Sequence, residues 1–99
     1  MKKLLIAAAA LVSLASAAQA DSAIYVYQIT GIEVCKVANP EAKKLVYMSQ
    51  QQLGERMMAG EFTSADLAKW KADYAAQAKG AAFCSKFASY LKILDIAAK

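Results

Sequence analysis

The sequence contains no histidine, and it has only one proline, four glycines and two cysteines. Without histidine, a serine or cysteine nucleophile lacks its usual general base, and a metal site lacks its commonest nitrogen ligand. No glycine-rich phosphate loop and no nucleophile-elbow motif is present either. So little proline and glycine leaves no segment with the composition of a flexible linker. We therefore expect a protein that is not an enzyme and that holds no cofactor and no metal.

A second segment with strand character is also lacking. Residues 23–37, AIYVYQITGIEVCKV, are rich in β-branched and aromatic side chains, which favours a strand. A single strand has nothing to pair with, so the sequence predicts instead a helix near 24–37 that is held by packing. Gly31 weakens such a helix by about 1 kcal/mol relative to alanine. An extended conformation of 24–37 stays open as the alternative.

The charge balance argues against nucleic acid as a partner. The chain carries 12 basic and 8 acidic residues, and without Lys2 and Lys3 the ten remaining basic residues leave a net charge of about +2. The lysines are scattered along the chain rather than gathered in one run. Such a charge is typical of a soluble surface and not of a nucleic-acid-binding patch.

Residues 1–20 have the pattern of a secretory signal peptide. Lys2 and Lys3 precede an apolar run at 4–14, and 18–20 (Ala-Gln-Ala) has the small–x–small pattern of a cleavage site. A membrane span needs about 20 apolar residues, which this run does not reach. We expect cleavage after Ala20, no membrane span afterwards, and a mature single domain at 21–99 that is periplasmic or secreted, through Gram-negative type export.

The next helix is predicted near 40–59. Asn39 is a preferred N-cap residue, Pro40 suits the first helical position, and Gly60 suits a left-handed C-terminal cap. The apolar stripe recurs every three or four residues. It consists of Leu45, Val46, Ser49, Leu53 and Met57, and Met48 is expected to widen it.

Three methionines, Met48, Met57 and Met58, raise the question of a copper(I) site. Two thiols and no histidine offer too few further ligands for zinc or copper. Methionine at helical spacing usually fills gaps in a core, and we interpret these residues in that way.

The strongest local signal in the chain begins at Thr63. Thr63 and Asp66 have the spacing of a capping box, and Phe62 and Leu67 that of a hydrophobic staple. The apolar row 67–70–74–78 continues in phase to Cys84, which favours one long helix near 64–97 with a kink at Gly80. A four-helix arrangement with a break near residue 80 is the alternative. The fold class is then all-α: a small three-helix domain, or four-helix in that alternative, with one disulfide.

The two cysteines, Cys35 and Cys84, form the predicted disulfide. An even number of cysteines in a small exported domain indicates a disulfide first. The loop that it closes spans roughly 50 residues, for which chain entropy gives about 4 kcal/mol of stability. A thioredoxin-type redox site needs cysteines two residues apart, and these two are distant in sequence.

Four aromatic residues are the candidate partner-binding surface: Tyr25, Tyr27, Trp70 and Tyr74. Aromatic side chains are enriched at protein interfaces, but they also fill cores, and both interpretations stay open. The expected partner is another protein or a second copy of the chain, as in a homodimer.

The overall plan is similar to that of the small periplasmic acid-stress chaperones, which combine a signal peptide, a small helical domain and two cysteines in one disulfide. The resemblance is one of plan and rests on no diagnostic residue. Our first hypothesis is a non-catalytic protein-interaction module. The resemblance implies the alternative, a stress chaperone that exposes apolar surface on unfolding in acid, which in this chain would depend on its eight carboxylates.

Overall fold

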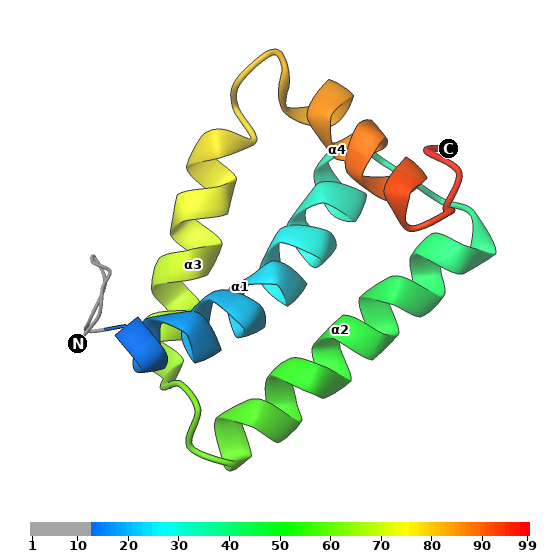
Figure 1. Cartoon of the computed structure of the whole chain (residues 1–99). Helices are drawn as coiled ribbons and strands as arrows, with labels where there is room; N and C mark the ends of the chain where they lie inside the picture. The colour runs from blue at the N-terminus through cyan, green and yellow to red at the C-terminus, as the bar shows by residue number, and fades with distance from the viewer. Residues whose placement is uncertain (1–12) are drawn as a thin grey trace.

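The chain folds around one central helix. The computed structural model describes residues 13–99, with side chains described from Asp21 onward, and these residues form helices, turns and short connections without a strand. The helices are α1 (Ser13–Val34), α2 (Pro40–Met58), α3 (Ser64–Gln77) and α4 (Phe83–Ile93). Helices α2 and α3 pack along α1, and α4 runs across the carboxyl-terminal half of α1 (Figure 1). The all-helical class is confirmed.

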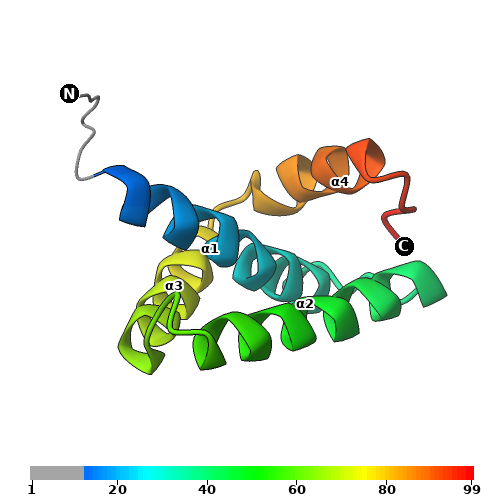
Figure 2. The ribbon, with the colours of Figure 1, turned by 60° about the horizontal axis from the view of Figure 1, so that its bottom comes forward.

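Helix α1 includes most of the segment with strand-like composition. Val26 and Ile32 are only 2% and 6% exposed, and they belong to two different apolar clusters on different sides of the helix. Figure 2 shows neighbouring helices on more than one side of α1. Burial on several sides therefore outweighs the poor helix propensity of β-branched residues. The prediction that this segment is helical rather than extended is confirmed.

The end of α1 lies earlier than predicted, at Val34 rather than near residue 37. Lys36 has a left-handed backbone with φ 56°, and the Val37 N–H donates to the Ile32 carbonyl at 3.1 Å. This is the bond that closes a Schellman motif, and Val37 and Ile32 are both buried in the same cluster, as that motif favours. The apolar pattern runs past the helix end because Val37 folds back onto the helix.

The predicted signal peptide falls largely on residues 1–12, which lie outside the described residues. Helix α1 begins at Ser13 and continues without interruption through the predicted cleavage position at Ala20. The signal peptide and its cleavage stay predictions.

Both ends of α2 form as predicted. The Asn39 side-chain oxygen accepts a hydrogen bond from the Ala42 N–H at 2.8 Å, and Pro40 is the first helical residue. At the other end Gly60 has φ 80°, and the Glu61 N–H donates to the Arg56 carbonyl at 3.0 Å.

The buried stripe of α2 is narrower than predicted. It consists of Ala42, Leu45, Ser49 and Leu53. Met57 packs against the core, but Met48 and Met58 are 48% and 91% exposed. The interpretation of all three methionines as core residues is therefore wrong for Met48 and Met58, which lie on the side of α2 that faces away from α1.

One long helix over 64–97 is not formed, and the alternative with a break near residue 80 is correct. Helix α3 ends at Gln77 and α4 begins at Phe83. Residues 79–82 are exposed, so no packing offsets the weak helix propensity of Gly80. The break lets α4 turn across α1 and bury Phe83, Phe87 and Leu91, which a straight continuation of α3 would carry away from α1.

Two apolar clusters share α1. The α4-side cluster lies between α1, α2 and α4, and the α3-side cluster lies between α1, α2 and α3. The buried residues of the α4-side cluster are Ile32, Val37, Ala42, Leu45, Phe87 and Leu91. Those of the α3-side cluster are Val26, Leu53 and Phe62, with Tyr25, Ile29, Met57, Leu67, Trp70 and Tyr74 packed against them.

Helix α4 is fastened to α1 by three kinds of contact. The disulfide Cys35–Cys84 joins the two helices with 5.5 Å between the Cα atoms. The Phe87 ring packs directly on the backbone of Gly31, where a Cβ atom would collide with the ring. The Tyr90 hydroxyl donates to the Gln28 side-chain oxygen at 2.6 Å.

A buried polar chain continues from Gln28 to α2. The Gln28 side-chain amide donates to the Ser49 hydroxyl at 2.8 Å, and Ser49 is fully buried. Gln28 thereby bridges α2 and α4 through its two ends. Because buried polar groups are costly when unpaired, this chain favours one relative placement of the three helices.

Candidate functional site

The candidate site is a groove between α2 and α3, with α1 as its floor. Helices α2 and α3 each pack on α1, make few contacts with each other and diverge from the connection at 59–63 (Figure 1). The space between them, which we call the α2–α3 groove, has a volume of about 650 Å³. Its lining consists of Val26, Ile29, Thr30, Glu33, Val34, Gln50, Leu53, Gly54, Met57, Leu67, Lys71 and Ala75.

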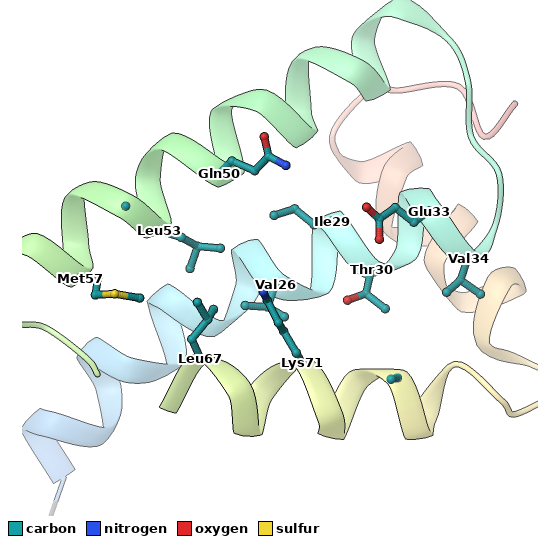
Figure 3. A pocket seen from close by; sticks show the side chains of 12 residues that line it. Val26, Ile29, Thr30, Glu33, Val34, Gln50, Leu53, Met57, Leu67 and Lys71 are labelled. Atoms are coloured by element: carbon teal, nitrogen blue, oxygen red, sulfur yellow. The ribbon is translucent and has the colours of Figure 1, made fainter. Parts of the chain in front are cut away.

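The floor and walls of the groove are mainly apolar. Figure 3 shows Val26 and Ile29 on α1 facing Leu53 and Met57 on α2, with Leu67 on α3 opposite them. All five residues belong to the α3-side cluster, in which Val26 and Leu53 are buried and Ile29, Met57 and Leu67 are half-buried. The groove is therefore a place where core side chains meet the surface, and its size is within the usual range for binding pockets.

The exposed polar groups of the lining, Glu33, Gln50 and Lys71, form the rim of the groove, and Thr30 on α1 is half-buried. Thr30 and Gln50 add neutral hydrogen-bonding groups, and Glu33 and Lys71 add one charge of each sign. Within residues 21–99 the one ion pair joins Arg56 and Glu61 at 3.6 Å, so Glu33 and Lys71 are paired neither with each other nor with another group. Both charges are available to a bound molecule.

Gly54 forms part of the α2 wall, and apart from its neighbours in α2 no atom lies within 4 Å of the position that its Cβ would occupy. The missing side chain widens the groove at this point. A side chain added here would enter open space, and the helix itself would tolerate it.

The predicted disulfide is present, and it lies outside the groove. Cys35 follows the last residue of α1, Cys84 is the second residue of α4, and neither cysteine is free. The pair closes a separation of 49 residues that contains all of α2 and α3. Its role in this arrangement is to hold α4 and the end of α1 together.

The four predicted interface residues all make contacts within the fold, and three of them, Tyr25, Trp70 and Tyr74, pack against the α3-side cluster. The Tyr27 ring lies 5.4 Å from Tyr74, and it also contacts three rings of α4: Phe83, Phe87 and Tyr90. Trp70 lies 5.0 Å from Phe62, and Tyr25 lies under the Arg56 guanidinium at 5.2 Å. All four are half-buried in contacts within the fold, and a role of their exposed edges in partner binding stays a prediction.

Three of the tyrosines titrate in an apolar setting. Burial raises the pKa of Tyr27, Tyr74 and Tyr90, because the phenolate is poorly solvated there. Neighbouring groups add to the rise: Tyr74 beside Tyr27, Asp73 beside Tyr74, and both Tyr27 and Tyr25 beside Tyr90. These hydroxyls stay protonated, as neutral hydrogen-bonding groups, at physiological pH.

The groove residues themselves were not predicted from the sequence. Leu53, Met57 and Leu67 lie on the predicted apolar stripes, where they are expected as core residues, whereas Gly54 and Lys71 lie beside those stripes. One signal does point toward them, because the apolar residues of 24–34 fit no single helical stripe. A helix with apolar residues on several sides needs neighbouring helices on more than two sides to bury them all.

Across residues 13–99, none of the helices has both the length and the apolar character that a membrane crossing requires. In the same part of the chain, no three cysteine or acidic side chains gather as metal ligands would. Comparison with protein-family models, with curated proteins and with solved structures finds no match in any of the three.

Proposed function

We propose that the protein is an exported, non-catalytic interaction module that binds a segment of a partner protein in the α2–α3 groove. The observation that carries the proposal is the groove, an apolar cavity of about 650 Å³ whose rim holds two opposite charges without partners. Apolar surface gives affinity and unpaired rim charges give selectivity, which is the combination found at recognition sites.

The disulfide supports export to the periplasm or beyond. Disulfides persist in oxidising compartments and are rare in a reducing cytosol. Cys84 is exposed, so cytosolic reductants would have access to it. This agrees with the signal-peptide pattern of residues 1–20.

A non-catalytic role accords with the chemistry of the lining. Its ionisable groups are one carboxylate, Glu33, and one amine, Lys71, and Thr30 is its one hydroxyl. Neither ionisable group is buried or held by a hydrogen bond in the way that a tuned general acid or base is.

Filling the groove at Gly54 tests the proposal. A photo-crosslinking residue at Gln50, on the groove rim, should join the protein to a partner in envelope extracts, and the same residue at Gln51 should not. Gly54→Trp, which fills the groove, should abolish the crosslink, whereas the matched control Gly54→Ala should retain it. Equal crosslinking by the Gly54→Trp and Gly54→Ala proteins would refute the proposal.

The alternative, an acid-activated chaperone, has less support in the charges of the fold. All the acidic residues among 21–99 are exposed except Asp66, which is half-buried. The one ion pair within residues 21–99, between Arg56 and Glu61, lies at the surface and contributes little to stability. We expect no binding of a hydrophobic dye at pH 3; dye binding together with client protection in acid would instead favour the chaperone.

A further inference from the structure

The two rim charges of the α2–α3 groove lie at different positions along α1. In the view of Figure 3, Lys71 on α3 lies at the level of Val26 along α1, and Glu33 lies further along α1, next to Val34. Val26 and Glu33 are seven residues apart, which is about 10 Å, or two helical turns, along the axis of α1. The groove therefore offers an apolar floor with a positive group near the level of Val26 and a negative group about two turns further along α1.

We infer that the segment bound in the α2–α3 groove is an amphipathic helix that carries one acidic and one basic residue seven positions apart beside its apolar face. Residues seven apart return to the same face after two turns, so both charges of such a helix would meet the rim. The acidic residue pairs with Lys71 and the basic residue with Glu33. This inference rests on the proposed function and specifies its partner.

A helix suits the walls of the groove better than an extended peptide does. The walls are the helices α2 and α3, whose internal backbone N–H and C=O groups are already paired within each helix. An extended peptide would find no strand edge here, and its own backbone groups would lie unpaired against apolar side chains. A helix satisfies its backbone internally and presents only side chains to Val26, Ile29 and Leu67.

A single-headed amphiphile and a second copy of the chain match the rim less well. An amphiphile with one charged end would leave either Glu33 or Lys71 without a partner. A second copy of the chain could offer the exposed face of α2, which carries the exposed side chains Tyr47 and Met48. The charges that flank this face, Lys44 and Glu55, lie eleven positions apart. That spacing is about 16 Å along the axis, too long for the rim.

Synthetic peptides test the inference directly. The probe is a fluorescent helical peptide with leucines at positions i, i+3, i+4 and i+7, flanked by a glutamate and a lysine seven positions apart. The control peptide has the same composition with the two charges nine positions apart, which places them on opposite faces. By fluorescence anisotropy, the wild-type protein should bind the probe about tenfold more tightly than the control, as expected for two surface charge pairs.

A charge reversal on the protein should reverse the preference. Lys71 is exposed, so Lys71→Glu leaves the fold intact and gives a rim with two acids. This variant should lose about tenfold in affinity for the probe, and it should gain affinity for a third peptide that carries lysine at both charged positions. A purely structural role of Lys71 predicts no such gain. Gly54→Trp should bind none of the peptides, and Gly54→Ala should bind like the wild type.

The possible results separate the inference from the proposed function. If Gly54→Trp abolishes the partner crosslink but the peptides bind without regard to charge spacing, the amphipathic-helix inference fails and the interaction module stands. If Gly54→Trp and wild type bind the probe equally well, the groove is not the site and both fail. Sedimentation that shows a dimer in wild type and a monomer in Gly54→Trp would assign the groove to a second copy. Saturable binding of a fluorescent fatty acid in place of the peptides would assign it to a lipid. Either of these results overturns the inference.

Discussion

Gly31 shows how one missing side chain sets the distance between two helices. The Phe87 ring occupies the space in which a Cβ of residue 31 would lie, and Phe87 is fully buried. Glycine costs helix stability at this position, but it permits the aromatic ring to reach the backbone of α1. The packing gained on the α4 side offsets the loss of propensity.

We predict that Gly31→Ala destabilises the protein, although alanine is the better helix former. The added methyl group must displace the Phe87 ring, and we expect the free energy of unfolding to fall by about 2–3 kcal/mol. Chemical denaturation measures the change. The matched control is Gly54→Ala, which has open space around it and should raise stability by about 1 kcal/mol. Equal effects of the two substitutions would contradict the role assigned to Gly31.

The buried tyrosines give the stability a pH dependence above neutrality. The pKa values of Tyr27, Tyr74 and Tyr90 are raised in the folded state by burial first and by their neighbours second. In the unfolded chain tyrosine ionises near pH 10, so ionisation above that pH stabilises the unfolded state more than the folded one. The contribution of these hydroxyls is complete below about pH 10 and is lost as pH rises further.

We predict that Tyr90→Phe flattens this alkaline loss of stability. The variant loses the hydrogen bond to Gln28 and should be about 1–2 kcal/mol less stable at neutral pH. Between about pH 9 and 11 its stability should fall less steeply than that of wild type, because one raised pKa is gone. Thermal melts across this range measure the slope. A slope for Tyr90→Phe equal to that of wild type would rule out the assignment.

At the scale of the helices, three of the four described helices end in the same manner. Lys36, Gly60 and Asp95 have φ values of 56°, 80° and 61° after α1, α2 and α4. In each case the next residue donates its N–H to a carbonyl five residues back, at 2.9–3.1 Å. Only one of these left-handed positions is glycine, the residue that adopts this conformation without a steric penalty.

We predict that Lys36→Gly stabilises the protein. A non-glycine residue with left-handed backbone is penalised by roughly 1–2 kcal/mol, and the greater freedom of glycine in the unfolded chain offsets part of the gain. The expected net increase in unfolding free energy is about 0.5–1 kcal/mol, measured by denaturant titration. Lys44→Gly, inside α2, should instead lower stability by about 1 kcal/mol. A loss of stability in Lys36→Gly would show that the left-handed position carries no strain.

How far each helix could be predicted depends on where its end signal lies. The starts of α2 and α3 are fixed by side chains within four residues: Asn39 caps Ala42, and Thr63 and Asp66 bond each other's backbone. The start of α4 has no such signal, since its N-cap, Ala82, makes no side-chain hydrogen bond. The in-phase apolar row therefore suggested one helix where tertiary packing makes two.

The groove was beyond prediction for a related reason. Its residues are ordinary members of three separate helices, and only the divergence of α2 from α3 brings Gly54, Glu33 and Lys71 around one cavity. The aromatic residues were predicted as an interface because of their residue type. In the structure they make contacts within the fold, as in the ring contacts of Tyr27 with Tyr74 and Tyr90. Residue type alone does not reveal which side of a helix faces a neighbour.

At the scale of the whole molecule, the disulfide fastens α4, a short helix whose start has no side-chain cap. A second fastening lies nearby: the Asn39 side-chain amide donates to the carbonyls of Ala97 and Lys99 at 2.6 and 2.7 Å. The residues after α4 are thus tied to the corner between α1 and α2. Both fastenings act on the α4-side cluster and leave the α2–α3 groove clear.

We predict that the double variant Cys35→Ser, Cys84→Ser loses about 4 kcal/mol of stability, because the unfolded chain regains the freedom of a loop of 49 residues. Denaturant titration of the variant beside wild type measures the difference. Thiol titration of the denatured, unreduced wild-type protein should find no free thiol. Two free thiols per chain would contradict the disulfide, and an unchanged denaturation midpoint in the variant would contradict its stabilising role.

The same disulfide also divides the molecule mechanically. A force applied to the two ends of the chain would pass through the Cys35–Cys84 bond, so the stretch between them, about 170 Å of contour length, would carry no tension. Helices α2 and α3, the walls of the groove, lie inside this shielded stretch, whereas all of α1, the floor, lies on the loaded side of Cys35. Under tension the groove would lose its floor first, while its walls stayed within one covalent ring.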